Sequence, residues 1–519
     1  MLSAIVLAAA TLVRPPDGTY AFRLTAAGAT LGTSTVVVTT SGGRITAVEN
    51  ASLPAQEITA KTTTVYDAAT LDELSYAADV HLPTGTQHTS VTLSGGKATI
   101  DVGTQHLVLQ ADPSAPVLVS VDNLPGDALW FPAVVHAHHA AAISLAVLAG
   151  GQVAVQRVQS DKGGFLTAAT GPLTLTYTYD PKTDVVRTMQ VPQQQAQVQL
   201  TSQNASTAPA PAPSPLATPV SLPPAHFVSK DVTFTSADGT RLAGTLTVPN
   251  TGAAPYPAVV LVHGSGPENR NEQIGPNAVF LQLATALSNA GFAVLRYDKR
   301  GIGKSGGNAR SMTRDELLQD VEAAFRFVRA QSSVDRSRVF LLGHSEGGEL
   351  VPSVAARTPG IAGIVLMAPP ALPLAQISTE QVLESVPASK RAQARSAQAA
   401  ALQKIRSGAT AGMSWYRSSM DVDPVEAIAQ VRVPMLILQG KADVQVLPKD
   451  LPRLVNAAKQ HNPHVTVHLF SGDNHLFMPA MPGTESSPQA ALKQYLTVPA
   501  RMDPAVLRTL IGWLKQPGV

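Results

Sequence analysis

The sequence contains no cysteine and has few charged and few aromatic residues. Without cysteine among its 519 residues, the chain has no disulfide, no thiolate metal site and no cysteine nucleophile. Charged residues make up 14%, and 38 Lys and Arg nearly balance 36 Asp and Glu, which leaves a formal net charge of +2. This balance excludes a protein that binds nucleic acid by neutralising phosphates, and a chain that is disordered because of its charge. Hydrophobic residues make up 44%, and the length exceeds the roughly 100 to 200 residues of one domain, so two or more globular domains are expected.

The first thirteen residues, MLSAIVLAAATLV, have the apolar length of the central region of a signal peptide. A basic segment before this region is lacking. We interpret residues 1–13 as the remnant of a signal peptide, the alternative being a buried first strand or helix. The protein is then expected to be secreted, periplasmic or associated with the cell envelope, and cytoplasmic if the segment is not a signal. No other apolar run approaches the roughly 20 residues of a membrane-spanning helix, so no integral membrane span is expected.

Residues 14–200 are predicted to form a separate β-rich antiparallel domain. They are rich in Thr, Val and Ala that alternate as in half-buried strands, for example at 20–24, 35–39 and 173–179, with turn signals such as Gly42-Gly43 between them. The histidines of this region, His136, His138 and His139, are interpreted as sheet-edge or surface residues. Metal binding is the alternative, but no carboxylate partner is evident nearby in the sequence.

A Pro/Ala/Ser tract at residues 201–225 is predicted to be a linker, because such a composition cannot bury a core. After it, residues 226–519 alternate short apolar runs with helical segments, which predicts a mostly parallel sheet with helices on both faces. Eight strands are expected, at 232–235, 242–248, 258–262, 293–297, 339–342, 364–367, 435–438 and 465–469. A helix is predicted to begin at the capping box Thr313–Glu316. Residues 370–432, approximately, interrupt the alternation and are long enough to form a helical lid.

The motif Gly343-His344-Ser345-Glu346-Gly347 matches G-x-S-x-G and lies between a predicted strand and a segment suited to a helix. The two glycines allow a turn so sharp that the serine oxygen stands clear of the sheet. The helix that follows directs its N-terminal N–H groups at a developing negative charge. Ser345 is therefore predicted to be a nucleophile.

A serine nucleophile needs a base that takes its proton and an acid that orients the base. In an architecture of this kind they follow the serine in the order acid, then histidine. Asp443 and His475 each follow a predicted strand, so both are assigned to the sheet edge at which Ser345 stands. The other candidates lie before a strand, on a helix, in the last strand or in the loop of His475 itself: Asp421, Asp423, Asp450, Asp473, His461, His464 and His468.

Acyl transfer also needs two N–H donors for the oxyanion. The backbone of Glu346 is predicted to be one. The other donor is predicted to be the backbone N–H of Ser265 in the loop His263–Pro267, and the N–H of Gly266 is the alternative. Four side chains are predicted to contact substrate: His263, His344, and two aromatic residues of the lid, Trp415 and Tyr416. For these two and for Met413, packing within the lid is an equal alternative.

The segment Gly301–Gly306 satisfies G-x-G-x-x-G after a predicted strand, which is the pattern of a dinucleotide-binding loop. A helix should open there, but the loop continues to Asn308 and the helix cap comes at Thr313. A phosphate-binding loop ending at Ser305 is also disfavoured, because Asp298 occupies the position of its first glycine. No nucleotide cofactor is therefore expected at this loop.

Three motifs that occur in order resemble the α/β-hydrolase superfamily, in particular its bacterial esterases and its dienelactone-hydrolase-like or serine-aminopeptidase-like branch. They are His-Gly-Ser-Gly-Pro at 263–267, Arg-Tyr-Asp-x-Arg-Gly-x-Gly-x-Ser at 296–305, and Gly-His-Ser-Glu-Gly at 343–347. The resemblance covers about 226–519, and the N-terminal half lies outside it. It implies an α/β-hydrolase fold and a serine hydrolase that needs no metal or cofactor.

Together these observations predict a serine carboxylesterase that cleaves a small-molecule ester through an acyl-enzyme. An alternative is an aminopeptidase or acyl-peptide hydrolase, in which Glu380, Glu384 or Asp421 would bind the free amine of the substrate. A more distant one is a non-catalytic binding protein that keeps the fold. The near-neutral charge favours an uncharged ester over a polyanion and gives no reason to expect a nucleic-acid partner.

Overall fold

The computed structural model describes most of the chain. The described residues are 13–26, 29–53, 58–82, 85–94, 97–102, 105–110, 116–120, 125–147, 152–161, 164–170, 173–191, 196–205, 220–266, 268–309, 311–384, 388–408, 414–486 and 488–516. Three predictions lie wholly or largely outside them: the signal peptide at 1–13, the middle of the linker at 201–225, and the pocket residue Met413.

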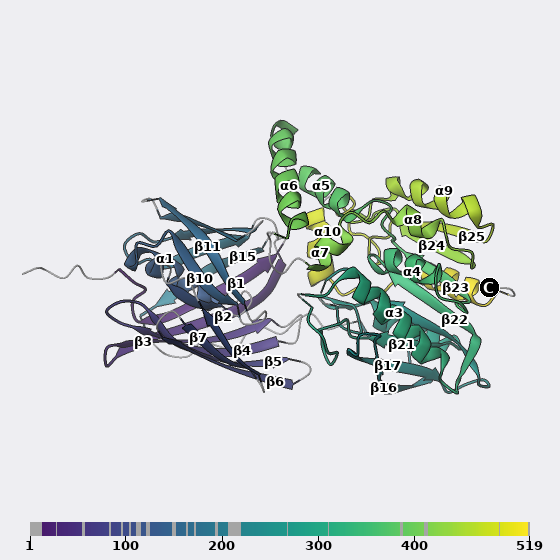
Figure 1. Ribbon diagram of the computed structural model, residues 1–519, viewed down its shortest axis with the longest axis horizontal. Coiled ribbons are helices and arrows are strands. Elements are labelled where there is room, and N and C mark those ends of the chain that lie inside the picture. The colour runs from purple at the N-terminus through teal and green to yellow at the C-terminus, as the bar shows by residue number, and fades with distance from the viewer. Residues whose placement is uncertain are drawn as a thin grey trace, which may run out of the picture. The chain divides into compact units, whose positions relative to one another are not determined.

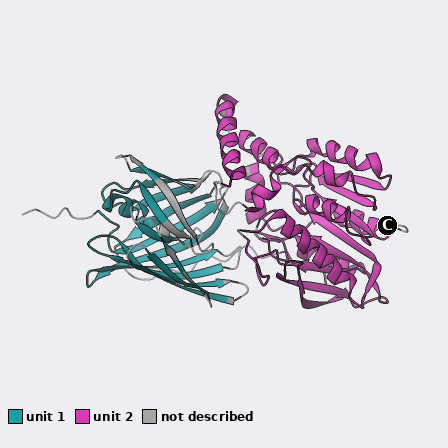
Figure 2. Cartoon of the chain, in the orientation of Figure 1, with its two compact units in different colours: residues 1–216 teal, residues 217–519 magenta. Residues whose placement is uncertain are grey.

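The chain forms two compact units, residues 1–216 and residues 217–519 (Figure 2). The division falls within the segment predicted as a linker. Each unit has its own hydrophobic core, so each is described separately.

The N-terminal unit is built on one 15-stranded sheet (Figure 1). Most of its strands pair antiparallel with the next strand in the chain, as predicted, and among the described residues β9 and β10 are the exception that pairs parallel. The strands are β1 (Gly18–Ala26), β2 (Ala29–Ser41), β3 (Arg44–Leu53), β4 (Ile58–Asp67), β5 (Glu73–Leu82), β6 (Gly85–Ser94), β7 (Lys97–Val102), β8 (Gln105–Gln110), β9 (Val117–Ser120), β10 (Ala142–Val147), β11 (Gln152–Asp161), β12 (Phe165–Thr170), β13 (Leu173–Tyr179), β14 (Val186–Val191) and β15 (Ala196–Asn204). Strand β1 pairs with both β2 and β15, which joins the first and last parts of the unit.

A helix that the sequence did not indicate, α1 (Pro125–Ala137), packs against this sheet. Trp130 lies 4.7 Å from Tyr66 between ring centroids, and Phe131 stacks on Tyr177 at the same distance. From Ala128 to Val135 every described side chain except that of Pro132 belongs to the unit's core cluster, so apolar residues do not recur at helical spacing. The absence of that spacing explains why the helix is not legible in the sequence.

The C-terminal unit contains an eight-stranded sheet in the order β16-β17-β21-β18-β22-β23-β24-β25. The strands are β16 (Phe227–Thr235), β17 (Arg241–Pro249), β18 (Tyr256–Val262), β21 (Ala293–Tyr297), β22 (Val334–His344), β23 (Gly363–Met367), β24 (Met435–Gly440) and β25 (Val465–Phe470). Six of them pair in parallel, and near one edge β17 pairs antiparallel with both β21 and the edge strand β16. The eight predicted strands are thus all present in a mostly parallel sheet. A short hairpin, β19 (Gln273–Ile274) and β20 (Asn277–Ala278), lies apart from it.

Helices cover both faces of this sheet because residues of each parallel strand alternate between two cores. In β18, Val260 belongs to one core and Val259 to the other. The first core packs against α3 (Arg314–Arg329), α4 (Gly347–Ala355), α8 (Pro424–Ile428) and α9 (Leu451–His461), and the second against α2 (Val279–Asn289), α10 (Pro488–Thr497) and α11 (Pro504–Leu514). The capping box predicted for α3 is confirmed, since the Thr313 side chain accepts from Glu316 N–H and the Glu316 carboxylate accepts from Thr313 N–H.

Between β23 and β24 the chain leaves the alternation, as predicted for residues 370–432. We call this segment the helical insertion. It contains α5 (Leu374–Glu384), a 3₁₀ turn (Ala388–Lys390), α6 (Arg391–Arg406), α7 (Ser414–Ser419) and α8. A small apolar cluster of its own, with Leu402, Ile405 and Met420, holds these helices together. A second 3₁₀ turn, Pro448–Asp450, precedes α9.

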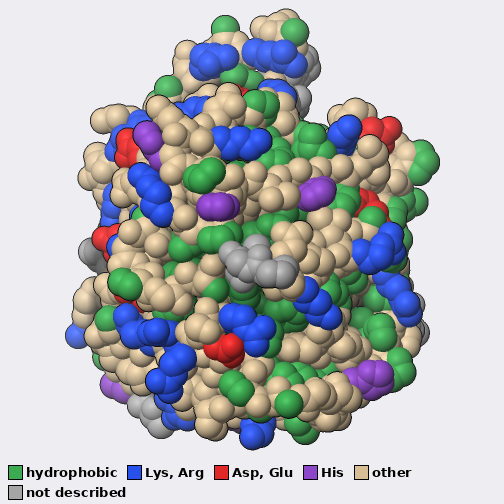
Figure 3. All heavy atoms as spheres, turned by 90° about the vertical axis from the view of Figure 1, so that its right-hand side faces the viewer, with side chains coloured by type: hydrophobic (Ala, Val, Ile, Leu, Met, Phe, Trp, Pro, Cys, Tyr) green, Lys and Arg blue, Asp and Glu red, His purple; other side chains and the backbone are tan. Residues whose placement is uncertain are grey.

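The surface carries dispersed charge, as the composition suggests. On the face drawn in Figure 3, Lys and Arg side chains are spread among uncharged and hydrophobic ones. None of the helices in the described part of the chain combines the length and the apolar character needed to cross a bilayer.

Candidate active site

Ser345 stands at a sharp turn between β22 and α4. Its φ angle is +53°, a left-handed conformation that is rare for a residue other than glycine. The turn is possible because both glycines of the motif face backbone at close range. A Cβ atom on Gly343 would lie 2.1 Å from the Gly347 carbonyl oxygen, and one on Gly347 would lie 2.1 Å from the Val262 carbonyl oxygen. The G-x-S-x-G spacing is therefore a steric requirement of this strand-turn-helix unit.

Asp443 and His475 come from the loops after β24 and β25 and form a buried pair. His475 Nδ1 lies 2.8 Å from Asp443 Oδ2. The Asp443 carboxylate also accepts hydrogen bonds from the N–H groups of Gln445 and Val446, at 2.8 and 3.0 Å, and from the Gln439 side chain at 2.9 Å. Such a fully bonded carboxylate is fixed in position and can hold the imidazole in one orientation.

A cavity of about 370 Å³ lies over the carboxyl ends of the parallel strands. Ser345 and His475 both line it, as do Gly264 and Ser265 from the loop after β18. The helical insertion supplies an apolar wall that includes Leu372, Leu374, Ile377 and Trp415. Carboxylic residues line the cavity as well: Glu268, Glu272, Glu346 and Glu349. The structure thus brings Ser345, His475 and the predicted oxyanion loop to one concave site.

The loop after β18 approaches the serine closely. A Cβ atom on Gly264 would lie 3.2 Å from the Ser345 Cβ. The Gly264 N–H donates to Glu272 Oε1 at 2.6 Å, which fixes the loop from behind. Ser265 is exposed to the cavity, whereas Gly266, the alternative donor, does not line it. Pro267 lies outside the described residues.

The structure gives the two predicted histidine contacts other roles. His263 is 2% exposed, packs on Phe280 and Tyr297, and does not line the cavity; burial lowers its pKa to about 4. The prediction that His263 contacts substrate is therefore wrong, and the residue is a neutral part of the core. His344 lines the cavity, but only 2% of its surface is exposed, because its ring faces partners inside the protein.

His344 links two loops of the site. Its Nε2 donates to the His475 carbonyl oxygen at 3.0 Å, and its Nδ1 forms an ion pair with Glu272 Oε1 at 3.1 Å. Burial opposes the charged form of His344, but the charge of Glu272 and the bond to the His475 carbonyl outweigh burial and raise its pKa to about 9. The imidazolium therefore bridges the His475 loop and the loop of Gly264.

The two aromatic residues of the helical insertion that were predicted to contact substrate separate into two roles. Trp415 lines the cavity, and its Nε1 donates to the Glu346 carboxylate. Tyr416 does not line the cavity. Its hydroxyl bonds to Ser378 Oγ at 2.5 Å, and its ring packs on the cluster inside the helical insertion. Packing within the insertion is thus the role that this geometry supports for Tyr416.

The glycine-rich segment Gly301–Gly306 encloses a carboxylate. Asp298 Oδ2 accepts from the Lys304 N–H at 3.0 Å, and a Cβ atom on Gly303 would lie 2.6 Å from the same carboxylate. The Arg270 guanidinium donates two hydrogen bonds to Asp298, at 2.7 and 3.0 Å, and the Arg270 backbone N–H donates a third at 2.9 Å. The loop is a structural turn built around Asp298, which accounts for the resemblance to a nucleotide-binding pattern.

The histidines of the N-terminal unit lie at the end of α1 and just after it and not at a sheet edge, whereas the alternative of a surface position holds for His139, which is exposed. Two of them have carboxylate partners from distant loops: His136 Nδ1 lies 3.0 Å from Asp184, and His138 Nε2 lies 3.5 Å from Asp72. Within the described part of the chain, no group of His, Asp and Glu side chains is arranged to hold a metal ion.

Sequence reasoning missed Glu268, which lines the cavity, and two charged residues that hold the loops around Ser345, Glu272 and Lys299. Glu272 is placed by the nine-residue loop that begins at Gly264, and Lys299 lies inside the Arg-Tyr-Asp-Lys-Arg-Gly segment. The one signal that the sequence offered for Lys299 is its position just after a strand predicted to be buried, because a buried charged residue is uncommon without a partner.

Comparisons with known proteins agree with this geometry. Residues 253–479 match the family model described as serine aminopeptidase, S33. The chain is 32% identical over 267 residues to Esterase EstD of Thermotoga maritima, covering 49% of this chain and 61% of that protein. It is also 32% identical over 145 residues to the uncharacterized protein YfhR of Escherichia coli strain K12, covering 28% of this chain and 48% of that protein. The chain therefore spans less than two thirds of the length of either relative.

Among solved structures, the Pyrococcus furiosus esterase Pf2001 is similar with a TM-score of 0.38 and 17% identity, covering 50% of this chain and 91% of that one. The family match, the eight-stranded sheet and the serine at its sharp turn all fall within one half of the chain. Residues 217–519 therefore have an α/β-hydrolase fold, as the sequence resemblance implies, and residues 253–479 among them match the family model.

Proposed function

We propose that this protein is a serine carboxylesterase that hydrolyses a small-molecule ester through an acyl-enzyme. One observation carries the proposal: Ser345 and His475 line the same cavity, and the buried Asp443 carboxylate lies 2.8 Å from His475 Nδ1. The similarity to a protein named as an esterase supports the choice of an ester substrate.

In this mechanism His475 takes the proton of Ser345 as its oxygen attacks the carbonyl carbon of the ester. Asp443 orients the imidazole and stabilises its charge. The N–H groups of Glu346 and Ser265 donate to the carbonyl oxygen as it becomes negative. His475 then gives its proton to the leaving alcohol. In the second step it takes a proton from the attacking water, and it returns that proton to Ser345 Oγ as the acyl–oxygen bond breaks and the acid leaves.

We assign the helical insertion the role of a lid that shapes the acyl pocket. Its apolar side chains Leu372, Leu374 and Ile377 line the cavity together with Trp415. An acyl chain that reaches this wall would lose its contact with water, which favours apolar acyl groups that the cavity of about 370 Å³ can hold. For the location of the protein, we retain the secreted or cell-envelope assignment.

An aminopeptidase is the second candidate, because the matching family model carries that description. Of the carboxylates predicted to bind an amine, Glu380 lies 3.7 Å from Lys449, and Asp421 pairs with Arg406 at 2.6 Å. Neither lines the main cavity, whereas Glu268 does. A free amine would therefore meet Glu268 in this site.

The test uses purified full-length protein with nitrophenyl esters of increasing acyl length beside aminoacyl and peptide anilides. Ester cleavage is expected to be faster, and Ser345→Ala is expected to abolish it. Asp443→Asn keeps the shape of the acid but not the orientation of the imidazole, so kcat should fall by about 10³- to 10⁴-fold. Asp335→Asn is the matched control, because Asp335 lies near the opposite end of β22 and bonds only locally, to Ser337 and Arg338.

Full ester hydrolysis by Ser345→Ala would end the serine mechanism. Hydrolysis of the anilides alone would favour the aminopeptidase proposal over the esterase proposal.

A further inference from the structure

Lys299 lies just after β21, and its ammonium group is buried between two segments that flank Ser345. The side chain is 3% exposed. Its Nζ donates to the Gly264 carbonyl oxygen at 2.9 Å and to Glu346 Oε2 at 2.7 Å. Gly264 precedes one predicted oxyanion donor, Ser265, and Glu346 is the other. One buried cation therefore touches both halves of the oxyanion site.

The bond to Gly264 sets the direction of the Ser265 N–H. The Gly264 carbonyl and the Ser265 N–H belong to the same peptide unit, which is planar and trans, so they point in opposite directions. With the carbonyl held toward Lys299, the Ser265 N–H must point away from Lys299. On the other side of Gly264, the preceding peptide N–H is held by Glu272 at 2.6 Å. Both peptide planes of this loop are thus fixed by charged groups.

The bond to Glu346 fixes the residue after the nucleophile. Its carboxylate accepts from Lys299 on one oxygen and from Trp415 Nε1 on the other. The backbone N–H of Glu346 opens α4, so a side chain held on both oxygens restrains the backbone to which it is attached. The Lys299 backbone N–H also donates to the Glu268 carbonyl oxygen at 3.1 Å, which ties the oxyanion loop a second time.

A buried ammonium group is costly unless it is paired, so its position calls for an explanation. Here one partner is a carboxylate and the other is the loop carbonyl that defines the Ser265 amide. We infer that Lys299 is the positioning residue of the oxyanion site, and that its ammonium group orients the Ser265 and Glu346 N–H donors toward the substrate carbonyl. This inference rests on the proposed serine hydrolase function and adds a residue to it.

The experiment compares Lys299→Met with the wild-type full chain. Donors that are misdirected by a fraction of an ångström bind the transition state less well but leave the substrate pocket unchanged. We expect kcat to fall by about 10²-fold with KM nearly unchanged. We also expect affinity for a trifluoromethyl ketone, which forms a tetrahedral adduct with the serine, to fall by about the same factor. Affinity for the corresponding methyl amide, which stays trigonal, should not change.

The matched control is Arg300→Met, because Arg300 is the next residue and is also 3% exposed, but binds Asp320 and its neighbours instead of the oxyanion loop. It should lower stability and leave kcat unchanged at temperatures where the protein is folded. If Lys299→Met does not fold, the double variant Lys299→Met/Glu346→Gln removes both buried charges and is measured in the same way.

Wild-type kcat and wild-type ketone affinity in a folded Lys299 variant would overturn the inference, as would a rise in KM alone. Such a result, with Ser345→Ala inactive, would leave the esterase proposal standing. An active Ser345→Ala would instead end the esterase proposal and the inference with it.

Discussion

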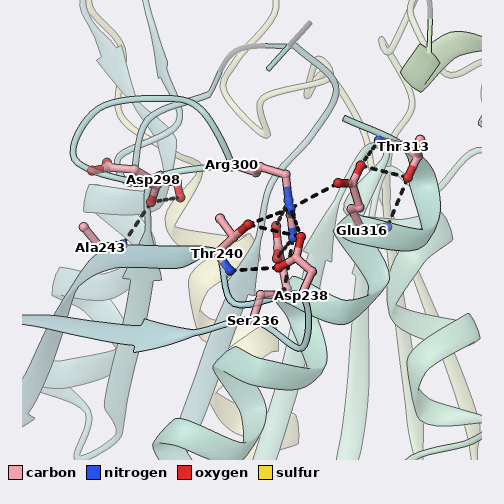
Figure 4. Close-up of polar contacts among 10 residues, drawn as sticks. Ser236, Asp238, Thr240, Ala243, Asp298, Arg300, Thr313 and Glu316 are labelled. Atoms are coloured by element: carbon pink, nitrogen blue, oxygen red, sulfur yellow. Dashed lines mark hydrogen bonds and ion pairs between the residues drawn. The ribbon is translucent and has the colours of Figure 1, made fainter. Parts of the chain in front are cut away.

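Arg300 is predicted to be a charged residue on which the stability of the C-terminal unit depends strongly. Its guanidinium binds Asp320 with two hydrogen bonds, at 3.0 and 2.6 Å, and Asp320 is 1% exposed. Figure 4 shows the same guanidinium among the side chains of Ser236, Asp238, Thr240 and Glu316. Replacing Arg300 by Met would leave the Asp320 carboxylate buried without its cation.

The cost can be worked from this burial. Burial raises the pKa of Asp320, and its bonds to Arg300 oppose that rise without cancelling it. Removal of one partner from such a pair typically costs about 3 to 5 kcal/mol, because the other charge stays uncompensated. For a unit of about 300 residues the entropy of unfolding is about 0.6 kcal/mol/K, so a loss of about 4 kcal/mol lowers Tm by about 6 °C.

The first assay is the midpoint of thermal unfolding by calorimetry. The second is the temperature at which half of the ester hydrolysis is lost, because this loss reports on the C-terminal unit alone. Arg338→Met is the control, because its pair with Asp335 is largely exposed and such pairs contribute about 0 to 1 kcal/mol. The double variant Arg300→Met/Asp320→Leu should recover much of the loss, because no buried charge remains unpaired. A shift below about 2 °C for Arg300→Met, or no recovery in the double variant, would refute the reasoning.

Two further predictions follow from single contacts. Gly347→Ala should abolish ester hydrolysis, since its Cβ would lie 2.1 Å from the Val262 carbonyl oxygen; folded protein with wild-type kcat would contradict this. For Glu268, burial and the charge of Glu272 raise the pKa to about 8, so the folded state keeps a proton that the unfolded chain releases near its ordinary value of 4.5. The stabilisation that the protonated Glu268 carboxyl gives to the folded state is fully present below about pH 4.5, and it is lost as the pH rises through about 8. Glu268→Gln should therefore flatten the fall of the urea midpoint between pH 5 and 8, and an unchanged slope would show that Glu268 does not titrate there.

Local features of the sequence were enough to predict those elements of the C-terminal unit whose structure is set by residues close together in the chain. The central parallel strands, such as β21, β23 and β24, are short apolar runs because each is buried on both faces. The start of α3 depends on Thr313 and Glu316, which are three residues apart and bond each other's backbone. The G-x-S-x-G turn depends on two glycines whose absent side chains make room for backbone.

Long-range packing decided what the sequence could not indicate. From Ala128 to Val135 helix α1 is buried on all sides, so this part of it has no polar face that would mark it as a helix. The predicted contact His263 proved to be a core residue, because which side of the loop it occupies depends on Phe280 and Tyr297. The partners of the N-terminal histidines, Asp184 and Asp72, are more than forty residues away in the chain, beyond any spacing rule.

The sequence by itself therefore determined the fold class of the second half, its strand order along the chain, and the serine, aspartate and histidine that follow three of those strands. These are local patterns, repeated at the period of a strand or a turn. Only the tertiary structure decided which charges are paired around Ser345. Lys299, Glu272 and His344 come from three separate segments, and their pairing exists only where the carboxyl ends of parallel strands bring those segments together. A buried charge is stable only with its partner, so the role of each of these residues is set by the fold.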